Sequence, residues 1–144
     1  MGVTTPSPLS LDRLVGLARR IRPREAGPTR LAMPAGMHAP LGHDTVATPA
    51  AYGPAILARL PRVGCVFGDG STWWWIVPSD SDVALQWPAP ARYVTGAVVR
   101  DARRPPHLIH HPESSVPYTP PIPLYLTLCR LTGATPAWSS AQAA

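Results

Sequence analysis

The stretch VGCVFGDGSTWWWIV, residues 63–77, constrains the fold more than any other part of the chain. Two apolar runs flank a Gly-rich turn, and glycine admits the positive φ angles that tight hairpin turns require. We therefore predict paired strands over residues 63–67 and 72–77. Side chains alternate along a strand, so Trp73 and Trp75 share one face and Trp74 lies on the other. Both faces are apolar, which favours a central strand that is covered on both sides.

The three tryptophans are not equivalent in this prediction. Gly64 on the neighbouring strand leaves room for one large ring, so we expect Trp74 to pack there against a helix of residues 50–60. Trp73 is next to the turn, and we expect it to be the most exposed of the three rings.

The remaining pattern completes an α+β domain with a small, mainly antiparallel sheet and one or two packed helices. We predict a strand over residues 44–48. A helix should follow over residues 49–60, with Thr48 as its N-cap and a bend or break at Pro54. Further short strands are expected in residues 83–87, 92–99 and 107–111. Residues 120–131 fit either a helix or a buried strand, and the Thr-Pro start favours the helix.

The domain is preceded by a basic segment. Apolar residues recur at helical spacing in residues 11–22 and predict an amphipathic helix: Leu11, Leu14, Val15, Ala18 and Ile21. The chain has 144 residues and 20 prolines, which suits one loop-rich domain with flexible ends. We predict a flexible basic arm with this short helix in residues 1–32, the α+β domain in residues 33–132, and a disordered tail in residues 133–144.

The net charge of +5 is unevenly distributed. Residues 1–62 hold eight arginines and three acidic residues, whereas the rest of the chain holds five of each. All 13 basic residues are arginine, and lysine and asparagine are absent, which is typical of a GC-rich genome such as that of an actinobacterium. The arginine excess is therefore partly a mutational bias and counts for less as an indication of nucleic-acid binding.

The cysteines and the hydropathy of the chain indicate in which cellular compartment the protein is expected. Cys65 and Cys129 lie in apolar contexts and predict buried, reduced thiols. The N-terminus lacks the pattern of a signal peptide, and no apolar run is long enough to span a membrane. We therefore expect a cytoplasmic protein without a membrane partner.

Two groups of residues have metal-binding chemistry. His107, His110 and His111 lie within five residues, but their spacing matches no closed zinc motif and favours a surface loop. Asp80 and Asp82 form a D-x-D pair of the kind that holds Mg²⁺, but PSDSD has the composition of a turn. We therefore assign no metal site and expect no cofactor. No Ser-His-Asp arrangement or phosphate-binding loop is found in the rest of the chain.

Three stretches together resemble small actinobacterial proteins of the bifunctional DNA primase/polymerase-like group. These stretches are MPAGMHAPLGHDTVATPAAYGPAILARL, VGCVFGDGSTWWWIVP and HLIHHPESSVPYTPPIPLYLTLCR, within residues 33–132. In that family the hairpin carries a histidine that contacts the nucleotide phosphate, and a D-x-D pair before the hairpin binds metal. Here Thr72 or Trp73 stands in place of the histidine, and only Asp44 lies in the region before the hairpin. The resemblance thus implies a shortened relative without the active site, which would need Mg²⁺ only if it were an active enzyme.

Two functional interpretations follow. The first is a non-catalytic primase/polymerase-like domain that binds nucleic acid or nucleotide. Its candidate binding residues are Arg19, Arg20, Arg22, Arg24, Trp73, Arg103 and Arg104. The second is a protein-interaction or regulatory module that uses the same scaffold and docks a protein partner through the N-terminal helix, without binding nucleic acid.

Overall fold

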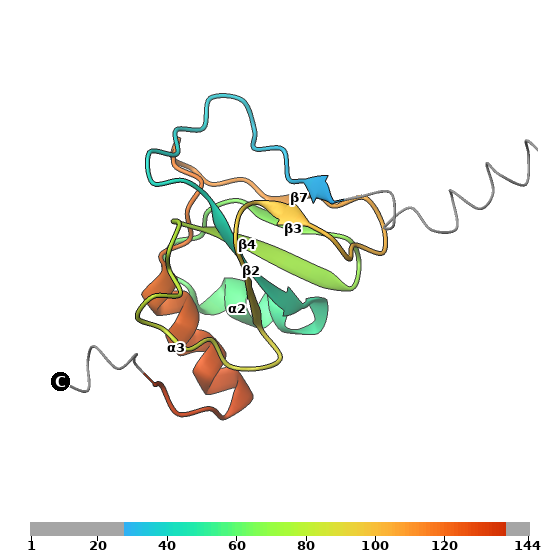
Figure 1. The fold of residues 1–144 in the computed structure, drawn as a ribbon. Helices are drawn as coiled ribbons and strands as arrows, with labels where there is room; N and C mark the ends of the chain where they lie inside the picture. Colours follow the sequence, from blue (N-terminus) through green and yellow to red (C-terminus); the bar gives the residue numbers. More distant parts are fainter. Residues whose placement is uncertain (1–27, 138–144) are drawn as a thin grey trace, which may run out of the picture.

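The computed structural model describes residues 28–137 as an α+β domain with an antiparallel sheet (Figure 1). The elements follow in the order β1 (Thr29–Arg30), β2 (Asp44–Pro49), η2 (Ala50–Tyr52), α2 (Gly53–Arg59), β3 (Val66–Gly68), β4 (Thr72–Val77), β5 (Arg92–Val94), β6 (Val98–Val99), β7 (His107–His110) and α3 (Pro121–Thr132). The predicted fold class is therefore confirmed. The predicted helix of residues 11–22 lies outside the described residues.

Strand β4 is the centre of a five-stranded sheet in the order β5-β2-β4-β3-β7. Its partners β2 and β3 both pair with it in antiparallel register, so that Trp74 lies opposite Ala47 on one side and Phe67 on the other. β1 and β6 form a separate antiparallel pair. The predicted hairpin is thus present, although its first strand begins at Val66.

Helices α2 and α3 cover one face of the sheet (Figure 1). Trp75 is fully buried in this layer, where it belongs to the same cluster as Ile56 of α2 and Leu128 of α3. Trp73 packs at the edge of the same cluster, with its ring centroid 5.8 Å from that of Trp75. The alternation of the strand therefore places Trp73 and Trp75, and not Trp74, on the helical side.

Trp74 faces the opposite layer, so its predicted packing against the helix of residues 50–60 is wrong. It lies in a second cluster with Phe67, with Val99 of β6 and with Leu31, which directly follows β1. The prediction failed because the space beside Gly64 is filled by backbone. A Cβ atom at Gly64 would lie 2.0 Å from the carbonyl oxygen of Pro117.

The helical segment after β2 is split as predicted, with a 3₁₀ turn before α2. Thr48 does not cap it: the N-cap position is Pro49, and no side chain caps the helix start. The Thr48 hydroxyl instead accepts a hydrogen bond of 3.0 Å from Nε1 of Trp75. The hydroxyl thereby satisfies the indole donor that the buried ring brings into the core.

Several boundaries differ from the sequence-based prediction. Residues 83–87 form no strand beyond an isolated bridge at Leu85, and residues 92–99 divide into β5 and β6 at Gly96, which has φ of 79°. Residues 121–132 form a helix, as favoured. Leu31 is buried, which extends the packed domain to the N-terminal side of residue 33. Within residues 28–137, no helix has the length and apolarity to cross a membrane.

Candidate functional site

The hairpin turn between β3 and β4 is held together by the buried carboxylate of Asp69. Its Oδ1 accepts hydrogen bonds from the backbone N–H groups of Ser71 and Thr72, both at 2.9 Å, and one from the Ser71 hydroxyl. Its Oδ2 accepts a 2.7 Å bond from the backbone N–H of Arg103. Burial alone would raise the pKa of Asp69, but these hydrogen bonds outweigh it and lower the pKa. The carboxylate is thus a fixed anion that joins the turn to the loop before β7.

This junction creates a small polar cavity of about 290 Å³, which we call the arginine pocket. Arg92 on β5 and Arg103 in the loop line it together with Ser71 and Thr72 of the turn. Arg92 also forms an exposed ion pair with Asp101, with an N–O distance of 3.4 Å. The Ser71 hydroxyl is already a donor to Asp69, so the two arginines and Thr72 are the lining residues with donors to offer an anion such as a phosphate group.

The predicted nucleic-acid-binding residues are only partly brought together. Arg103 lines the arginine pocket, and the Arg104 guanidinium reaches to 3.8 Å from the position of a Cβ atom on Gly70 in the turn. Trp73 is half-buried, and its ring lies against Gly53 of α2. The other four candidates, Arg19, Arg20, Arg22 and Arg24, lie outside the described residues.

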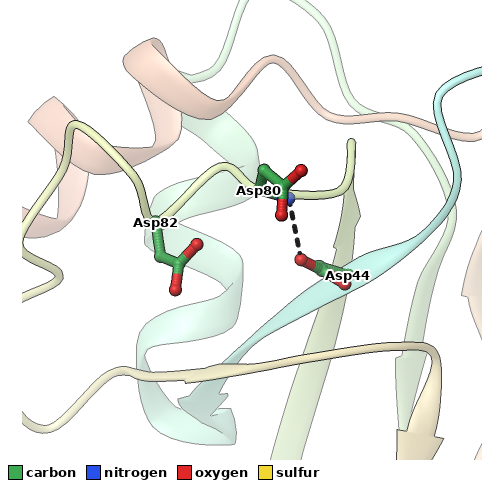
Figure 2. Close-up of side chains that lie close together, drawn as sticks. All are labelled: Asp44, Asp80 and Asp82. Carbon is green, nitrogen blue, oxygen red and sulfur yellow. Dashed lines mark hydrogen bonds between the residues drawn. The ribbon is translucent and has the colours of Figure 1, made fainter.

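Three carboxylates meet at the opposite end of β4. Asp44 at the start of β2 lies beside Asp80 and Asp82, which follow β4, and one oxygen atom of each lies within 4.8 Å of the others (Figure 2). Among residues 28–137 this is the group of His, Cys, Asp and Glu side chains with a spacing that suits a metal ion. The sequence had suggested only the D-x-D pair, because Asp44 is 36 residues distant from Asp80 along the chain.

Asp44 is already engaged by protein groups. Its Oδ2 accepts hydrogen bonds from the Asp80 backbone N–H at 2.9 Å and from the Tyr93 hydroxyl at 2.5 Å, and its Oδ1 accepts one from the Gly96 backbone N–H at 2.7 Å. Burial, and then the bond to Asp44, raise the pKa of Tyr93 far above its usual value, so this hydroxyl remains a donor. Asp80 has φ of 66°, a conformation rare for non-glycine residues. The carboxylate of Asp44 therefore organises the two loops that follow β4 and β5.

The histidines do not gather into a ligand set. His107 and His111 are exposed, and His111 donates from Nδ1 to the Pro112 carbonyl at 2.7 Å. His110 donates from Nδ1 to the Gly64 carbonyl at 2.9 Å, a bond between β7 and the segment before β3. The imidazoles of His110 and His111 therefore hold backbone segments in place through these hydrogen bonds.

A larger cavity of about 920 Å³ lies between the end of α2 and the segment that leads into α3. We call it the apolar groove. One wall is formed by Leu57, Leu60 and Val63, and the other by Val116, Tyr118 and Pro120. Polar residues that also line it are Arg62, His110, Glu113 and Ser114. Val116 is 38% exposed, so the apolar surface is open to a binding partner.

Sequence reasoning missed Arg92, Asp44 and the groove. Arg92 reads as one residue of a short strand, and only the sheet order places it beside the hairpin turn. For Asp44 a signal existed, because an acidic residue at the start of a predicted apolar strand is unusual and calls for partners. The groove had no sequence signal, since its two walls are more than fifty residues apart.

No known protein family, curated protein sequence or solved structure matches the chain.

Proposed function

We propose that the chain is a non-catalytic, primase/polymerase-like domain of the cytoplasm that binds nucleic acid through its phosphate backbone. The arginine pocket is the observation that carries this proposal. Arg92 and Arg103 come from separate segments and line one cavity together with Ser71 and Thr72. Arg104 lies beside the same turn and extends the basic surface.

The size of the pocket indicates which part of the ligand enters it. About 290 Å³ is at the lower limit of small-molecule sites, which span roughly 300–1,000 Å³. Such a cavity suits a phosphate group with part of a sugar, and the base would remain outside. Recognition would then follow the backbone and carry little sequence information.

The proposed absence of catalysis is supported by the carboxylate cluster. A two-metal or one-metal phosphoryl-transfer site needs carboxylate oxygens that are available to the ion. Oδ2 of Asp44 accepts two hydrogen bonds and Oδ1 accepts one, so this carboxylate keeps a single lone pair that could reach an ion. A structural role for Asp44 also accounts for why an acidic residue is buried at this position.

The test is a salt series of fluorescence anisotropy with labelled single-stranded and double-stranded oligonucleotides. We expect Arg103→Ala to weaken binding and to reduce the slope of log K against log salt by about 1, as for one lost phosphate contact. Arg130→Ala is the control, because Arg130 is an equally exposed arginine on α3, away from the pocket. Binding that is absent, or that changes equally in both variants, would reject the proposal.

The second candidate function is a protein-interaction module, and the apolar groove is the observation that favours it. Its lining is mainly apolar and also includes polar residues, as in sites that receive an amphipathic helix. This function does not require nucleic acid. A chain that binds a protein partner but no oligonucleotide would therefore support this function against the first.

A further inference from the structure

The apolar groove has no occupant among residues 28–137, and its walls offer aliphatic side chains to whatever fills it. Leu57 is only partly buried on α2, and Val116 stands 38% exposed on the opposite wall. Exposed apolar surface in a concave site is the usual feature of an interaction site. The inference drawn from it does not depend on the nucleic-acid-binding proposal.

We propose that the apolar groove is the intramolecular docking site of residues 11–22 of the same chain. This segment lies outside the described residues, but its sequence is known. It carries five apolar side chains at helical spacing, and Leu17, Asp12 and basic residues lie between them, a pattern typical of an amphipathic helix. A groove that is lined mainly by apolar residues and also by polar ones is the complement of such a helix.

The length of the connecting chain is compatible with this arrangement. Leu31 donates its backbone N–H to the Ala97 carbonyl, and His38 donates its backbone N–H to the carbonyl of Ser115, which lies between the groove-lining residues Ser114 and Val116. The eight residues from Leu31 to His38, which are seven Cα–Cα steps, therefore bring the chain from the β1–β6 pair to the groove. Seven Cα–Cα steps also separate Arg22 from Thr29, and such a connection reaches about 23 Å when extended.

The charged residues of the groove favour one orientation of this occupant. Arg62 and Glu113 both line the groove, so a basic helix end is attracted to the Glu113 side and repelled from the Arg62 side. Residues 19–22 include three arginines at the end of the segment that is nearer to the domain. An exposed pair of this kind contributes little to affinity, but it selects one direction for the helix in the groove.

The test uses the full chain with the double substitution Leu14→Glu/Val15→Glu, which places charge on the apolar face of the segment. A fluorescent synthetic peptide of residues 9–24 is then added. We expect the peptide to bind this variant at least tenfold more tightly than it binds the wild-type chain, whose own segment competes at high effective concentration. Equal binding to both chains, or no binding, would overturn the proposal.

Two further substitutions in the same variant identify the surface. Val116→Asp should weaken peptide binding at least tenfold, whereas Val83→Asp should leave it unchanged. Both valines are exposed, 38% and 69%, but only Val116 lines the groove. A scrambled peptide of the same charge should not bind. Equal effects of the two substitutions would assign the peptide to another surface.

A second measurement does not depend on the folding of the Val116→Asp chain. A spin label at the C-terminus of the peptide should broaden the methyl NMR signals of Leu57 and Val63 in the Leu14→Glu/Val15→Glu chain, and not those of Val83.

Light scattering tests whether the docking is intramolecular. A wild-type dimer that becomes monomeric in the Leu14→Glu/Val15→Glu chain would show that the segment occupies the groove of a second copy, which contradicts intramolecular docking.

Discussion

Asp44 joins three parts of the molecule with a single carboxylate. It is 4% exposed at the start of β2, and its partners come from the loop after β4, from β5 and from the turn after β5. A buried carboxylate is stable only when donors replace its hydration, and here two backbone N–H groups and one phenol do so. Substitutions of Asp44 therefore measure how much these side-chain hydrogen bonds contribute to the stability of the loops.

We expect Asp44→Ala to lower the free energy of unfolding by about 3 kcal/mol, because it leaves buried donors without an acceptor. Asp44→Asn retains one acceptor oxygen and should cost about half as much. Urea unfolding monitored by tryptophan fluorescence measures both values. Asp82→Asn is the matched control, since Asp82 is an exposed member of the same cluster, and a similar loss there would refute the assigned role of Asp44.

The three adjacent tryptophans should differ in their contribution to stability. Trp74 and Trp75 are 1% and 0% exposed in opposite layers, so alanine at either position should cost about 3–5 kcal/mol. Trp73 is half-buried at the edge of the helical layer, and its replacement by alanine should cost less. Denaturant unfolding of the three variants gives the order. If Trp73→Ala is the most destabilising, the register of β4 is incorrect.

His43 should make stability depend on pH. Burial lowers its pKa from 6.5, and the charge of Asp44 offsets only part of this effect. Nε2 of His43 is buried and has no hydrogen-bond partner among the described residues. Because the folded pKa is the lower one, the unfolded chain binds the proton first as the pH falls below about 6.5. Stability should then be highest above this value and should decline toward pH 5.

The measurement is urea unfolding at pH 7.5 and pH 5.0 for the wild type and for His43→Phe. The difference in unfolding free energy between the two pH values should be smaller in His43→Phe than in the wild type, and His107→Phe, which replaces an exposed histidine, is the comparison variant. The lowered pKa of Asp69 affects stability in a separate, more acidic pH range. The stabilisation by the Asp69 carboxylate is fully present above the unfolded pKa of 3.8 and is lost only as the pH falls through the lower folded pKa.

At the scale of the elements, the sequence predicted the strands and helices whose local pattern is strong. The turn around Gly70, with φ of 98°, and the six residues of β4 were predictable because turn chemistry and alternation agree there. β2, α2 and α3 followed from apolar runs and from proline positions. Each of these elements carries its own signal within about a dozen residues.

The layer that each face contacts was not predictable from the sequence. Both faces of β4 are apolar, so the pattern does not indicate which one receives the helices. That choice depends on the segment of residues 117–119, whose backbone lies directly against Gly64. Cys65 donates its N–H to the Pro117 carbonyl at 2.8 Å, and Gly64 donates to the Thr119 hydroxyl at 2.9 Å. Contacts between segments so distant in sequence leave no local signal.

The same limit applied to the candidate sites. Arg103 and the D-x-D pair were found because they occur in short motifs. Arg92 and Asp44 entered the pocket and the cluster only through the order of the strands.

Two glycines should show how closely the elements approach each other. A Cβ atom at Gly53 would lie 2.4 Å from the ring of Trp73, and one at Gly64 would lie 2.0 Å from a backbone oxygen. Gly53→Ala should therefore cost about 1–3 kcal/mol, although alanine favours a helix. Gly64→Ala should cost more, because backbone cannot move aside as a side chain can. Thermal unfolding tests both. Gly36→Ala separates the effect of crowding from that of backbone strain: Gly36 has φ of 86°, but a Cβ there meets nothing within 4 Å.

At the scale of the whole molecule, the two ends of β4 have opposite chemistry. The arginine pocket adjoins the turn before it, and the acidic cluster follows its last residues. A polymerase site would need nucleotide phosphates and metal-binding carboxylates side by side. Here a six-residue strand separates them, which spans roughly 20 Å.

We therefore expect no template-dependent incorporation of deoxynucleotides or ribonucleotides with Mg²⁺ or Mn²⁺. Primer extension on a labelled template, analysed on a denaturing gel, provides the measurement. Incorporation by the wild-type chain that disappears in Asp80→Ala/Asp82→Ala would show that the cluster is catalytic. Incorporation that persists in this variant would indicate a contaminating polymerase.

The short outer strands of the five-stranded sheet have a consequence for behaviour at high concentration. β5 has three residues and β7 has four, and the pairing of β7 with β3 is interrupted by a register shift. Long, flat outer strands are the templates on which other chains add during fibril growth. Here each outer strand presents only a few backbone groups, and Arg92 puts a charge on one of them. The rim of this sheet therefore opposes the edge-to-edge aggregation that its unusually apolar central strand would otherwise invite.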